Sequence, residues 1–392
     1  GYDDSPQETV MKKKDYQKLS IALHKKLRGK ISIEPKFTIK NRHDLSLAYT
    51  PGVAGPSLLI AKNKKEALNL TATKNAVAVI SDGSAVLGLG NIGPEAALPV
   101  MEGKCVLFKK FAKLDAFPIV LDTQDTEEII AAIKAIAPTF GAINLEDISA
   151  PRCFEIEKRL VKELSIPVMH DDQHGTAIVV LAGLINALKV VRKRKETAQV
   201  VISGAGAAGI AIVKILARYG FKNILLVDSK GIVSKKRKNL SPIKKEVLKI
   251  TNKKSVSGNL KDALRKADVF IGVSKGNLLS ERDIENMNAG AIVFALANPI
   301  PEIMPDRARK AGAAVVSSGR SDFPNQINNS LAFPGIFKGA LRSKKNKITE
   351  SMKIAAAEAL ARLVKKPTAE KIIPGPFDRS VADAVAKAVS KN

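Results

Sequence analysis

Short apolar segments that read as strands alternate with helical patterns along most of this chain of 392 residues. Such alternation is typical of parallel sheets with crossover helices on their faces. Two series are present, and a helical segment at 176–193 separates them. Because a single core rarely grows beyond ~250–300 residues, the length favours two domains. We predict an α/β fold of two doubly wound, mainly parallel-sheet domains, at 1–170 and 171–392, the second of the Rossmann type.

The elements of both series can be assigned from the apolar pattern. Strands are predicted at 76–80, 118–121, 142–145 and 167–169 in the first series, and at 199–202, 223–227, 269–271, 291–295 and 314–316 in the second. Helices are predicted at 15–30, 95–113, 126–136, 154–164, 349–364 and 379–388. Residues 31–57 are expected to be irregular, and two prolines and two glycines within 49–56 are expected to exclude helix there.

The chain is strongly basic, with 64 Lys and Arg against 38 Asp and Glu and a net charge of +26. Nucleic-acid-binding proteins cluster such charge on one face and add aromatic side chains for stacking. Here the lysines are spread along the chain, aromatic residues make up 4% and tryptophan is absent. We therefore interpret the charge as a solvated lysine-rich surface, and we expect no nucleic-acid partner.

Cysteine content and hydropathy predict a cytoplasmic protein. Cys105 and Cys153 are the only cysteines, and both lie in apolar-periodic segments, so we expect them to be reduced and buried. The longest uncharged run, 175–188, is shorter than the ~20 residues that span a bilayer. We expect no secretory signal and no membrane contact, and we interpret residues 1–10, which precede Met11, as an extension outside the fold.

A glycine-rich turn opens the second series and predicts a dinucleotide site. The turn follows a buried strand, precedes a helix and consists of Gly204, Ala205, Gly206, Ala207, Ala208 and Gly209. Glycines at these places let a pyrophosphate approach the backbone at the positive end of a helix. Asp228 closes the next predicted strand, where a carboxylate binds ribose hydroxyls and favours NAD. Lys230 and the basic tetrad 235–238 oppose that preference, so NAD and NADP both stay open.

Three acids follow predicted strands of the first domain. Glu146 and Asp147 end one strand, and Asp172 comes just after another. Because strand carboxyl ends line the ligand crevice of an open α/β sheet, these acids can converge on a divalent cation such as Mg²⁺ or Mn²⁺. The alternative is that these acids cap helices, with Asp147 or Ser149 capping the helix near 152 and Asp172 the helix near 175. His170 and His174 are interpreted as hydrogen-bonded histidines rather than ligands.

Two further side chains are candidates for proton transfer. Lys104 lies in an unusually apolar segment, where desolvation would lower its pKa and make a neutral amine available as a base. A lysine that extends its head into water is the alternative. Tyr49 opens the irregular stretch, and the sequence alone allows either proton donation or simple packing for its phenol.

Several sequence blocks together resemble the malic enzymes, the oxidative decarboxylases of L-malate, in their shorter bacterial form. The resemblance extends from residue 47 to residue 335, and its most specific blocks are Val86–Gly93, Met101–Lys104, Asn144–Asp147 and His170–Thr176. It implies that the substrate is L-malate, that NAD or NADP is reduced and that a divalent metal is required. It also implies a homodimer, with the segment of Tyr49 near its interface.

The resemblance also implies individual roles. Tyr49 would be the proton donor and Lys104 the general base, with Glu146, Asp147 and Asp172 as metal ligands. Asn298 and Asn329 would hold the substrate and the nicotinamide, and Asp171 would orient the lysine or a ligand.

One position departs from the family pattern. Larger members have an arginine for the malate carboxylate just before the Leu-Gly-Leu-Gly turn, where this chain has Ala85. Asn329, the metal or a backbone turn would have to neutralise that carboxylate instead. Two alternatives to the oxidative reaction are a decarboxylase that retains its cofactor and acts on malate or oxaloacetate, and a non-catalytic polyanion-binding protein.

Overall fold

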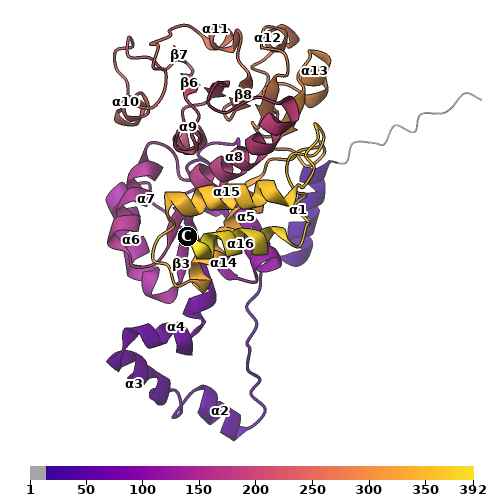
Figure 1. Ribbon diagram of the computed structural model, residues 1–392. Coiled ribbons are helices and arrows are strands. Elements are labelled where there is room, and N and C mark those ends of the chain that lie inside the picture. Colours follow the sequence, from indigo (N-terminus) through magenta and orange to yellow (C-terminus); the bar gives the residue numbers. More distant parts are fainter. Residues whose placement is uncertain (1–14) are drawn as a thin grey trace, which may run out of the picture.

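The structure, a computed structural model, describes residues 15–392, so the predicted extension at 1–10 lies outside the described residues. Two sheets lie one above the other, the first in the lower part of Figure 1 and the second in the upper part. Helix α8 (Asp171–Val191) connects them. The predicted α/β class with two doubly wound sheets is confirmed.

The first sheet is entirely parallel, in the order β2-β1-β3-β4. Its strands are β1 (Ala76–Ser81), β2 (Asp115–Val120), β3 (Ala142–Leu145) and β4 (Val168–His170). The chain leaves β1 toward β2 on one side and later returns to form β3 on the other side. The strand order therefore reverses between β1 and β3, and a ligand crevice is expected at the carboxyl ends of these strands.

The second sheet has the order β10-β9-β8-β5-β6-β7, and only the short edge strand β7 is antiparallel to its neighbour. Its strands are β5 (Gln199–Ser203), β6 (Asn223–Asp228), β7 (Gly231–Ile232), β8 (Val269–Gly272), β9 (Ile292–Ala295) and β10 (Val315–Ser318). In this sheet the strand order reverses between β5 and β8, so a second ligand crevice is expected there. The turn after β5 lies at that crevice.

Helices cover both sheets. The helices that cover the first sheet are α5 (Pro94–Leu107) with a π-helical turn (Phe108–Ala112), α6 (Thr126–Ile136) and α7 (Arg152–Glu163). Those of the second half are α9 (Ala207–Tyr219), α10 (Pro242–Val247), α11 (Leu260–Leu264), α12 (Glu281–Glu285), α13 (Pro305–Lys310), α14 (Phe333–Arg342), α15 (Glu350–Leu363) and α16 (Val381–Lys391). Helices α5, α6, α7, α15 and α16 lie within a few residues of the predicted ranges, whereas α14 was not predicted.

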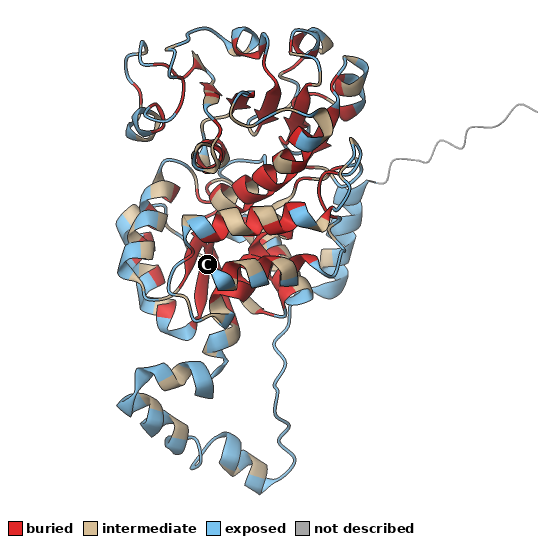
Figure 2. Cartoon of the chain, in the orientation of Figure 1, coloured by how far each residue is buried: buried red, intermediate tan, exposed pale blue. Residues whose placement is uncertain are grey.

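Helix α8 forms the centre of the largest core. Buried residues on α8, one face of β1, β5 and the C-terminal helices belong to a single apolar cluster. By length and composition α8 could cross a membrane, but 67% of its apolar window is buried inside the protein, which makes it a core helix. Figure 2 shows the same helix largely in the colour of buried residues.

The C-terminal helices pack beside the first sheet although they follow the second one in sequence. Phe333 and Phe337 on α14 contact the ring of Phe108, with ring centroids 4.7 and 5.4 Å apart. Residues 333–391 thus close the structure around α5 and α8 (Figure 1). The division at 170/171 stays a prediction, since the core is continuous across it.

Residues 31–66, here called the N-terminal arm, project from the amino-terminal edge of the first sheet (Figure 1). The arm contains α2 (Arg42–Ala48), α3 (Ala54–Lys62) and a 3-10 turn (Lys64–Glu66), and neither α2 nor α3 has a buried residue. Two short helical turns, Ala67–Leu70 and Ala72–Asn75, lead from the arm into β1. The prediction that 49–56 excludes helix is wrong, because Pro56 lies in the first turn of α3, where a missing N–H costs no helical hydrogen bond.

Preceding the arm, α1 (Tyr16–Leu27) also lacks buried residues. The chain is tied to the body between α1 and the arm, where the Lys30 backbone N–H donates to Glu102 (2.8 Å) and its Nζ donates to the Pro99 carbonyl (2.6 Å). The arm itself exposes leucines on α2 and α3, and Figure 2 shows it in the colour of exposed residues along its length.

Candidate functional site

The three acids predicted to converge do so at the carboxyl ends of β3 and β4. Oxygen atoms of Glu146, Asp147 and Asp172 all lie within 4.8 Å of one another. Glu146 and Asp147 follow β3, and Asp172 lies in the first turn of α8, directly after β4. This is the edge of the first sheet at which the strand order reverses.

The surroundings disfavour the charged form of two of these acids, Glu146 and Asp147, whereas His170 and Lys104 outweigh burial at Asp172 and lower its pKa. Burial and the neighbouring Asp172 raise the pKa of Asp147 to about 8, and burial raises that of Glu146 well above its ordinary value. The Oδ2 atom of Asp147 is buried and has no hydrogen-bond partner. Asp147 also adopts a left-handed backbone conformation with φ of 54°, which is uncommon outside glycine and concentrates at functional sites. Carboxylate oxygens of this kind fit a hard divalent cation.

Lys104 is buried on α5 and points into this acidic cluster. Its Nζ lies 2.6 Å from Asp171 Oδ2 and 2.9 Å from Glu146 Oε1, and 4.2 Å from the centre of the Phe333 ring. Burial by itself would lower the pKa of Lys104, but the negative charges of Asp171, Glu146 and Asp172 outweigh it and raise the pKa. The expectation of a lowered pKa is therefore wrong for the lysine among these carboxylates. The alternative, in which the Lys104 amine extends into water, is contradicted as well, because the side chain is buried.

The cap interpretation of the acids is also contradicted. The helices α7 and α8 begin without any side-chain cap hydrogen bond. Asp172 instead accepts a hydrogen bond from the backbone N–H of Asp147 (2.7 Å), which ties the ends of β3 and β4 together.

The two histidines are held by protein groups, as expected. His170 is buried, with Nδ1 3.0 Å from the Gln173 amide, and His174 lies with Nε2 2.9 Å from Glu157 and Nδ1 3.0 Å from Lys353.

Asn298 and Asn329 approach this edge from the second half of the chain. A Cβ added to Gly88 would collide with the carbonyl oxygen of Asn298, so the Leu-Gly-Leu-Gly turn touches the loop after β9. A Cβ added to Gly175 would lie 1.9 Å from Asp171 Oδ1 and 3.1 Å from the Asn329 Cβ. Asn329 is therefore next to Asp171, at the first turns of α8.

Tyr49 is not at this site. It lies in the arm at the C-terminal end of α2, and 68% of it is exposed. The arm joins the amino end of β1, whereas the acids lie at the carboxyl ends, about 20 Å away along a strand of six residues. Ala85 does lie at the site, where its backbone N–H donates to the Asp147 carbonyl (2.9 Å).

Sequence reasoning missed a second ion pair at the same edge. Arg152, the first residue of α7, donates to the buried Asp82 (2.9 Å), which follows β1. The position of Asp82 directly after a buried strand is the signal that could have identified it.

The glycine-rich turn lies between β5 and α9, as predicted. Gly204 has φ of 117°, which favours glycine, and Gly206 precedes α9 without a side-chain cap. A Cβ added to Gly209 would lie 1.7 Å from the Gly204 carbonyl oxygen, so this residue must be glycine for helix and turn to pack. The uncapped N–H groups at the start of α9 can bind a phosphate.

Asp228 ends β6, as expected for a ribose-binding acid, but its carboxylate is already engaged. Arg237 donates to both of its oxygens (2.9 and 3.0 Å), and Lys244 donates to Oδ2 (2.6 Å). These hydrogen bonds outweigh the effect of burial and lower the pKa of Asp228 to about 2. The pairing with Lys244 was not foreseen from the sequence.

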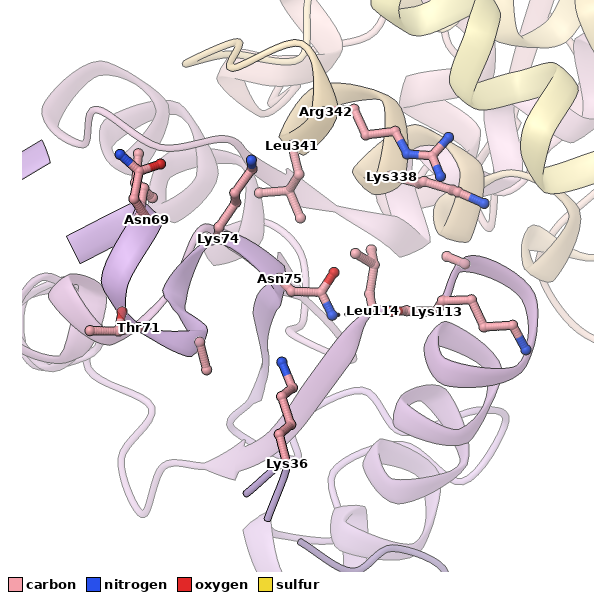
Figure 3. A pocket seen from close by; sticks show the side chains of 13 residues that line it. Lys36, Asn69, Thr71, Lys74, Asn75, Lys113, Leu114, Lys338, Leu341 and Arg342 are labelled. Atoms are coloured by element: carbon pink, nitrogen blue, oxygen red, sulfur yellow. Dashed lines mark hydrogen bonds between the residues drawn. The ribbon is translucent and has the colours of Figure 1, made fainter. Parts of the chain in front are cut away.

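A cavity of about 360 Å³ lies away from this site, at the base of the arm (Figure 3). It is lined by residues of the arm, residues just before β1, residues at the end of the π-helical turn and residues on α14, among them Lys36, Lys74, Lys113 and Lys338. None of the predicted site residues lines it.

Comparisons with known proteins cover most of this architecture. Residues 28–161 match the family model of the malic enzyme N-terminal domain, and residues 173–392 match that of the malic enzyme NAD-binding domain. The chain is 56% identical over 375 residues to the bifunctional malic/malolactic enzyme of Bacillus subtilis, covering 95% of this chain and 92% of the relative. It is 55% identical over 363 residues to an NAD-dependent malic enzyme of Geobacillus stearothermophilus, covering 92% and 76%.

Solved structures show the same fold. An NAD-dependent malic enzyme from Thermotoga maritima is 51% identical, with a TM-score of 0.91 and coverage of 94% of this chain and 98% of that one. The malic enzyme of Entamoeba histolytica is 39% identical, with a TM-score of 0.92 and coverage of 96% and 81%.

Proposed function

This chain belongs to the malic enzyme family, and we propose that Lys104 is its general base, Tyr49 its proton donor and Glu146, Asp147 and Asp172 its metal ligands. The reaction is the oxidative decarboxylation of malate to pyruvate and CO₂ with reduction of NAD(P)⁺. The observation that carries the assignment of roles is the buried lysine amine enclosed by carboxylates at the crevice of the first sheet.

The three carboxylates are suited to Mg²⁺ or Mn²⁺, because they offer hard oxygen ligands and a buried oxygen that lacks any other partner. When bound, the cation would polarise the C2 oxygen of the substrate as a Lewis acid, and NAD(P)⁺ would accept the hydride.

Lys104 would take the proton of the malate C2 hydroxyl on its Nζ atom. Asp171, 2.6 Å from that atom and fully buried, holds the amine in place. Cation binding at the three carboxylates would offset the part of the negative charge that comes from Glu146 and Asp172, and so would shift the pKa of Lys104 toward the neutral amine. Asn298 and Asn329 would hold the substrate and the nicotinamide with their amides, and with the missing arginine at Ala85, Asn329 is a candidate for the malate carboxylate.

Tyr49 would deliver a proton to C3 of the three-carbon product, and its position favours a homodimer. The arm exposes Tyr49 together with Leu45, Leu47, Leu58 and Leu59, an apolar surface that the body of the same chain does not cover. Exposed apolar surface of this extent is typical of an interface. We propose that the arm lies against a second copy of the chain and supplies Tyr49 to the site of that copy.

The cellular location proposed is the cytoplasm. Cys105 and Cys153 are free and buried, which agrees with a protein that does not depend on an oxidising compartment.

The test of this function is malate-dependent reduction of NAD⁺ and of NADP⁺, followed by nicotinamide absorbance, with Mn²⁺ and with chelator. Reduction that requires Mn²⁺ and yields an equal amount of pyruvate supports the proposal. Folded protein that reduces neither cofactor with Mn²⁺ present would contradict it.

A second activity is favoured by one relative, the malic/malolactic enzyme of Bacillus subtilis. We propose that this chain also converts malate to lactate when the reduced cofactor stays bound. Lactate formed without net accumulation of reduced cofactor would support this activity, and pyruvate as sole product would exclude it.

A further inference from the structure

The cavity at the base of the arm is lined by cations and by no acid. Its volume of about 360 Å³ is within the range of small-ligand pockets. Five of its thirteen lining residues are Lys or Arg, a share more than twice that of the whole chain, 64 of 392. They are Lys36, Lys74, Lys113, Lys338 and Arg342. A cleft lined by charge of one sign raises the local concentration of the opposite ion, so this cavity is suited to an anion.

Most of these cations lack an acidic partner. Among the described residues 15–392, four of the five have no carboxylate oxygen within 4.0 Å of their charged nitrogen atoms. They are Lys36, Lys74, Lys113 and Arg342. The acids near the cavity are paired with other groups, Asp383 with Lys338 (2.6 Å) and Asp115 with Lys109 (2.6 Å). Because like charges around one cavity repel each other, an anion bound among them would relieve that repulsion.

The cavity lies where both ends of the arm meet the body of the protein. Lys36 belongs to the segment through which the chain leaves the body, and Lys74 belongs to the last helical turn before β1. In the view of Figure 3, Lys36 lies on the side of the cavity opposite to Lys74 and to the residues of α14.

The body supplies the fixed wall of this cavity. Asn75 donates to the Lys113 carbonyl (3.0 Å), which ties the turn before β1 to the end of the π-helical turn. A Cβ added to Gly141 would lie 2.6 Å from the Thr73 carbonyl oxygen and 2.8 Å from Leu341 Cδ2, so α14 packs closely on the same turn. The cations on this wall are therefore held together by packing that does not involve the arm.

We propose that this cavity binds a small anion with two or more negative charges, and that the anion holds the outgoing end of the arm against the body. An anion that contacts Lys36 together with Lys74 and Lys113 joins the two. Phosphate groups and clustered carboxylates share the chemistry that such a site recognises, since both offer several charged oxygen acceptors to Lys and Arg donors. None of the proposed malate, metal or dinucleotide residues lines the cavity, so this anion binds in addition to substrate and cofactor.

The first measurement is binding, with pyrophosphate as a phosphate probe and citrate as a carboxylate probe. Each is titrated by calorimetry into the full chain without added metal. We expect at least one of them to bind with a dissociation constant below about 1 mM, which a few charge-assisted hydrogen bonds can supply. Binding of pyrophosphate alone identifies a phosphate-bearing ligand, and binding of citrate alone identifies a polycarboxylate. Binding of neither probe would overturn the proposal.

The second measurement locates the bound anion. The cavity variant carries Lys74→Gln and Lys113→Gln, and the matched control carries Lys261→Gln on α11 and Lys310→Gln on α13. Each variant loses two exposed lysines, but those of the control lie outside the cavity. The cavity variant should bind the probe at least about 10-fold more weakly, because two charged donors are lost, and the control should keep the wild-type affinity. Equal affinities in the two variants would contradict the proposed site.

The third measurement is hydrogen exchange of the backbone amides with and without the bound probe. Amides of residues 31–40 should exchange more slowly in the wild-type protein with probe, since an opening that separates Lys36 from the bound anion becomes less favourable. The cavity variant should show no such slowing at the same probe concentration. A probe that binds in the cavity without slowing exchange in this segment would exclude the link to the arm. Both binding and exchange are measured without malate or NAD(P), so these results and those for the proposed function are independent.

Discussion

Among single residues, Glu157 shows how a buried acid contributes stability near the site without taking part in chemistry. It lies on α7, where His174 contacts its Oε2 atom (2.9 Å) and the backbone N–H of His170 donates to Oε1 (2.8 Å). Burial would raise the pKa of Glu157, but His174 and Lys353 outweigh it, so the pKa falls from its ordinary value of 4.5 to about 2.

The stability from Glu157 should depend on pH in a definite direction. Because the folded protein binds this proton more weakly than the unfolded chain does, the contribution is complete above about pH 4.5 and is lost as the pH falls toward 2. We expect Glu157→Gln to cost about 3 kcal/mol in unfolding free energy at neutral pH. Denaturant unfolding at pH 7 and at pH 3 checks this: the difference between wild type and variant should shrink at pH 3. A difference that is the same at both values would contradict the argument.

Lys104 is the residue whose loss should affect turnover most selectively. We expect Lys104→Ala to lower kcat by about 1,000-fold, since general-base catalysis contributes factors of that order. Its Mn²⁺ affinity should not weaken, because the variant removes a cation 2.9 Å from Glu146. Steady-state kinetics and Mn²⁺ titration of the same preparation test both statements. Near-normal turnover would exclude Lys104 as the base.

Substitution of Asp172 tests whether the acidic cluster binds a metal or has only a structural role. We expect Asp172→Ala to weaken Mn²⁺ binding at least about 10-fold, since it removes one of the three proposed ligands. The matched control is Asp122→Ala, which removes an exposed acid just after β2 at the same edge of the sheet. Calorimetry measures the Mn²⁺ affinity of both variants. Equal affinities in the two would show that the cluster does not bind the cation.

Among the elements, the turn between β5 and α9 combines two glycines with different tasks. A Cβ at Gly209 would collide with the Gly204 carbonyl, whereas a Cβ at Gly206 meets no protein atom within 4 Å. We expect Gly209→Ala to lower the melting temperature by several degrees, since the helix must shift. Gly206→Ala should keep the wild-type melting temperature but bind nucleotide more weakly, because its methyl group occupies the approach of the pyrophosphate. Thermal unfolding and nucleotide titration of both variants test this, and identical effects at the two positions would contradict it.

At the scale of the whole molecule, the arm determines whether one chain holds a complete site. Suppose that Tyr49 of one chain serves the site of a second copy. A mixed dimer, with Tyr49→Phe in one chain and Lys104→Ala in the other, then has one site in which both residues are intact. Mixing and reassembling the two inactive variants should restore about a quarter of wild-type activity, because half of the dimers are mixed and each has one working site of two.

The controls for this mixing experiment are the two variants alone, each carried through the same reassembly. If both are inactive and the mixture stays inactive although mixed dimers are present, then Tyr49 serves its own chain. If Tyr49→Phe alone retains wild-type turnover, then Tyr49 is not the proton donor in either arrangement.

The sequence by itself determined the fold class and most of the candidate site. Periodicity located the strands within a few residues, because buried parallel strands are short apolar runs bounded by turns. The acids after β3 and β4 were predicted to converge, since the carboxyl ends of parallel strands share one edge, and they lie within 4.8 Å. The requirement for glycine at Gly209 was likewise readable from its position between a strand and a helix.

Only the tertiary structure decided the rest, because it depends on groups that are distant in sequence. The pKa of Lys104 is raised rather than lowered, since Asp171, 67 positions away, lies 2.6 Å from its amine. The acceptor positions of Asp228 are filled by Arg237 and Lys244 across a loop. Tyr49 is separated from the acids because the arm leaves β1 at its amino end, while every proposed metal ligand lies at the carboxyl ends of β3 and β4. The local apolar pattern of a sequence indicates which face of an element is buried. Contacts between residues that are distant in sequence depend on how the elements pack against one another.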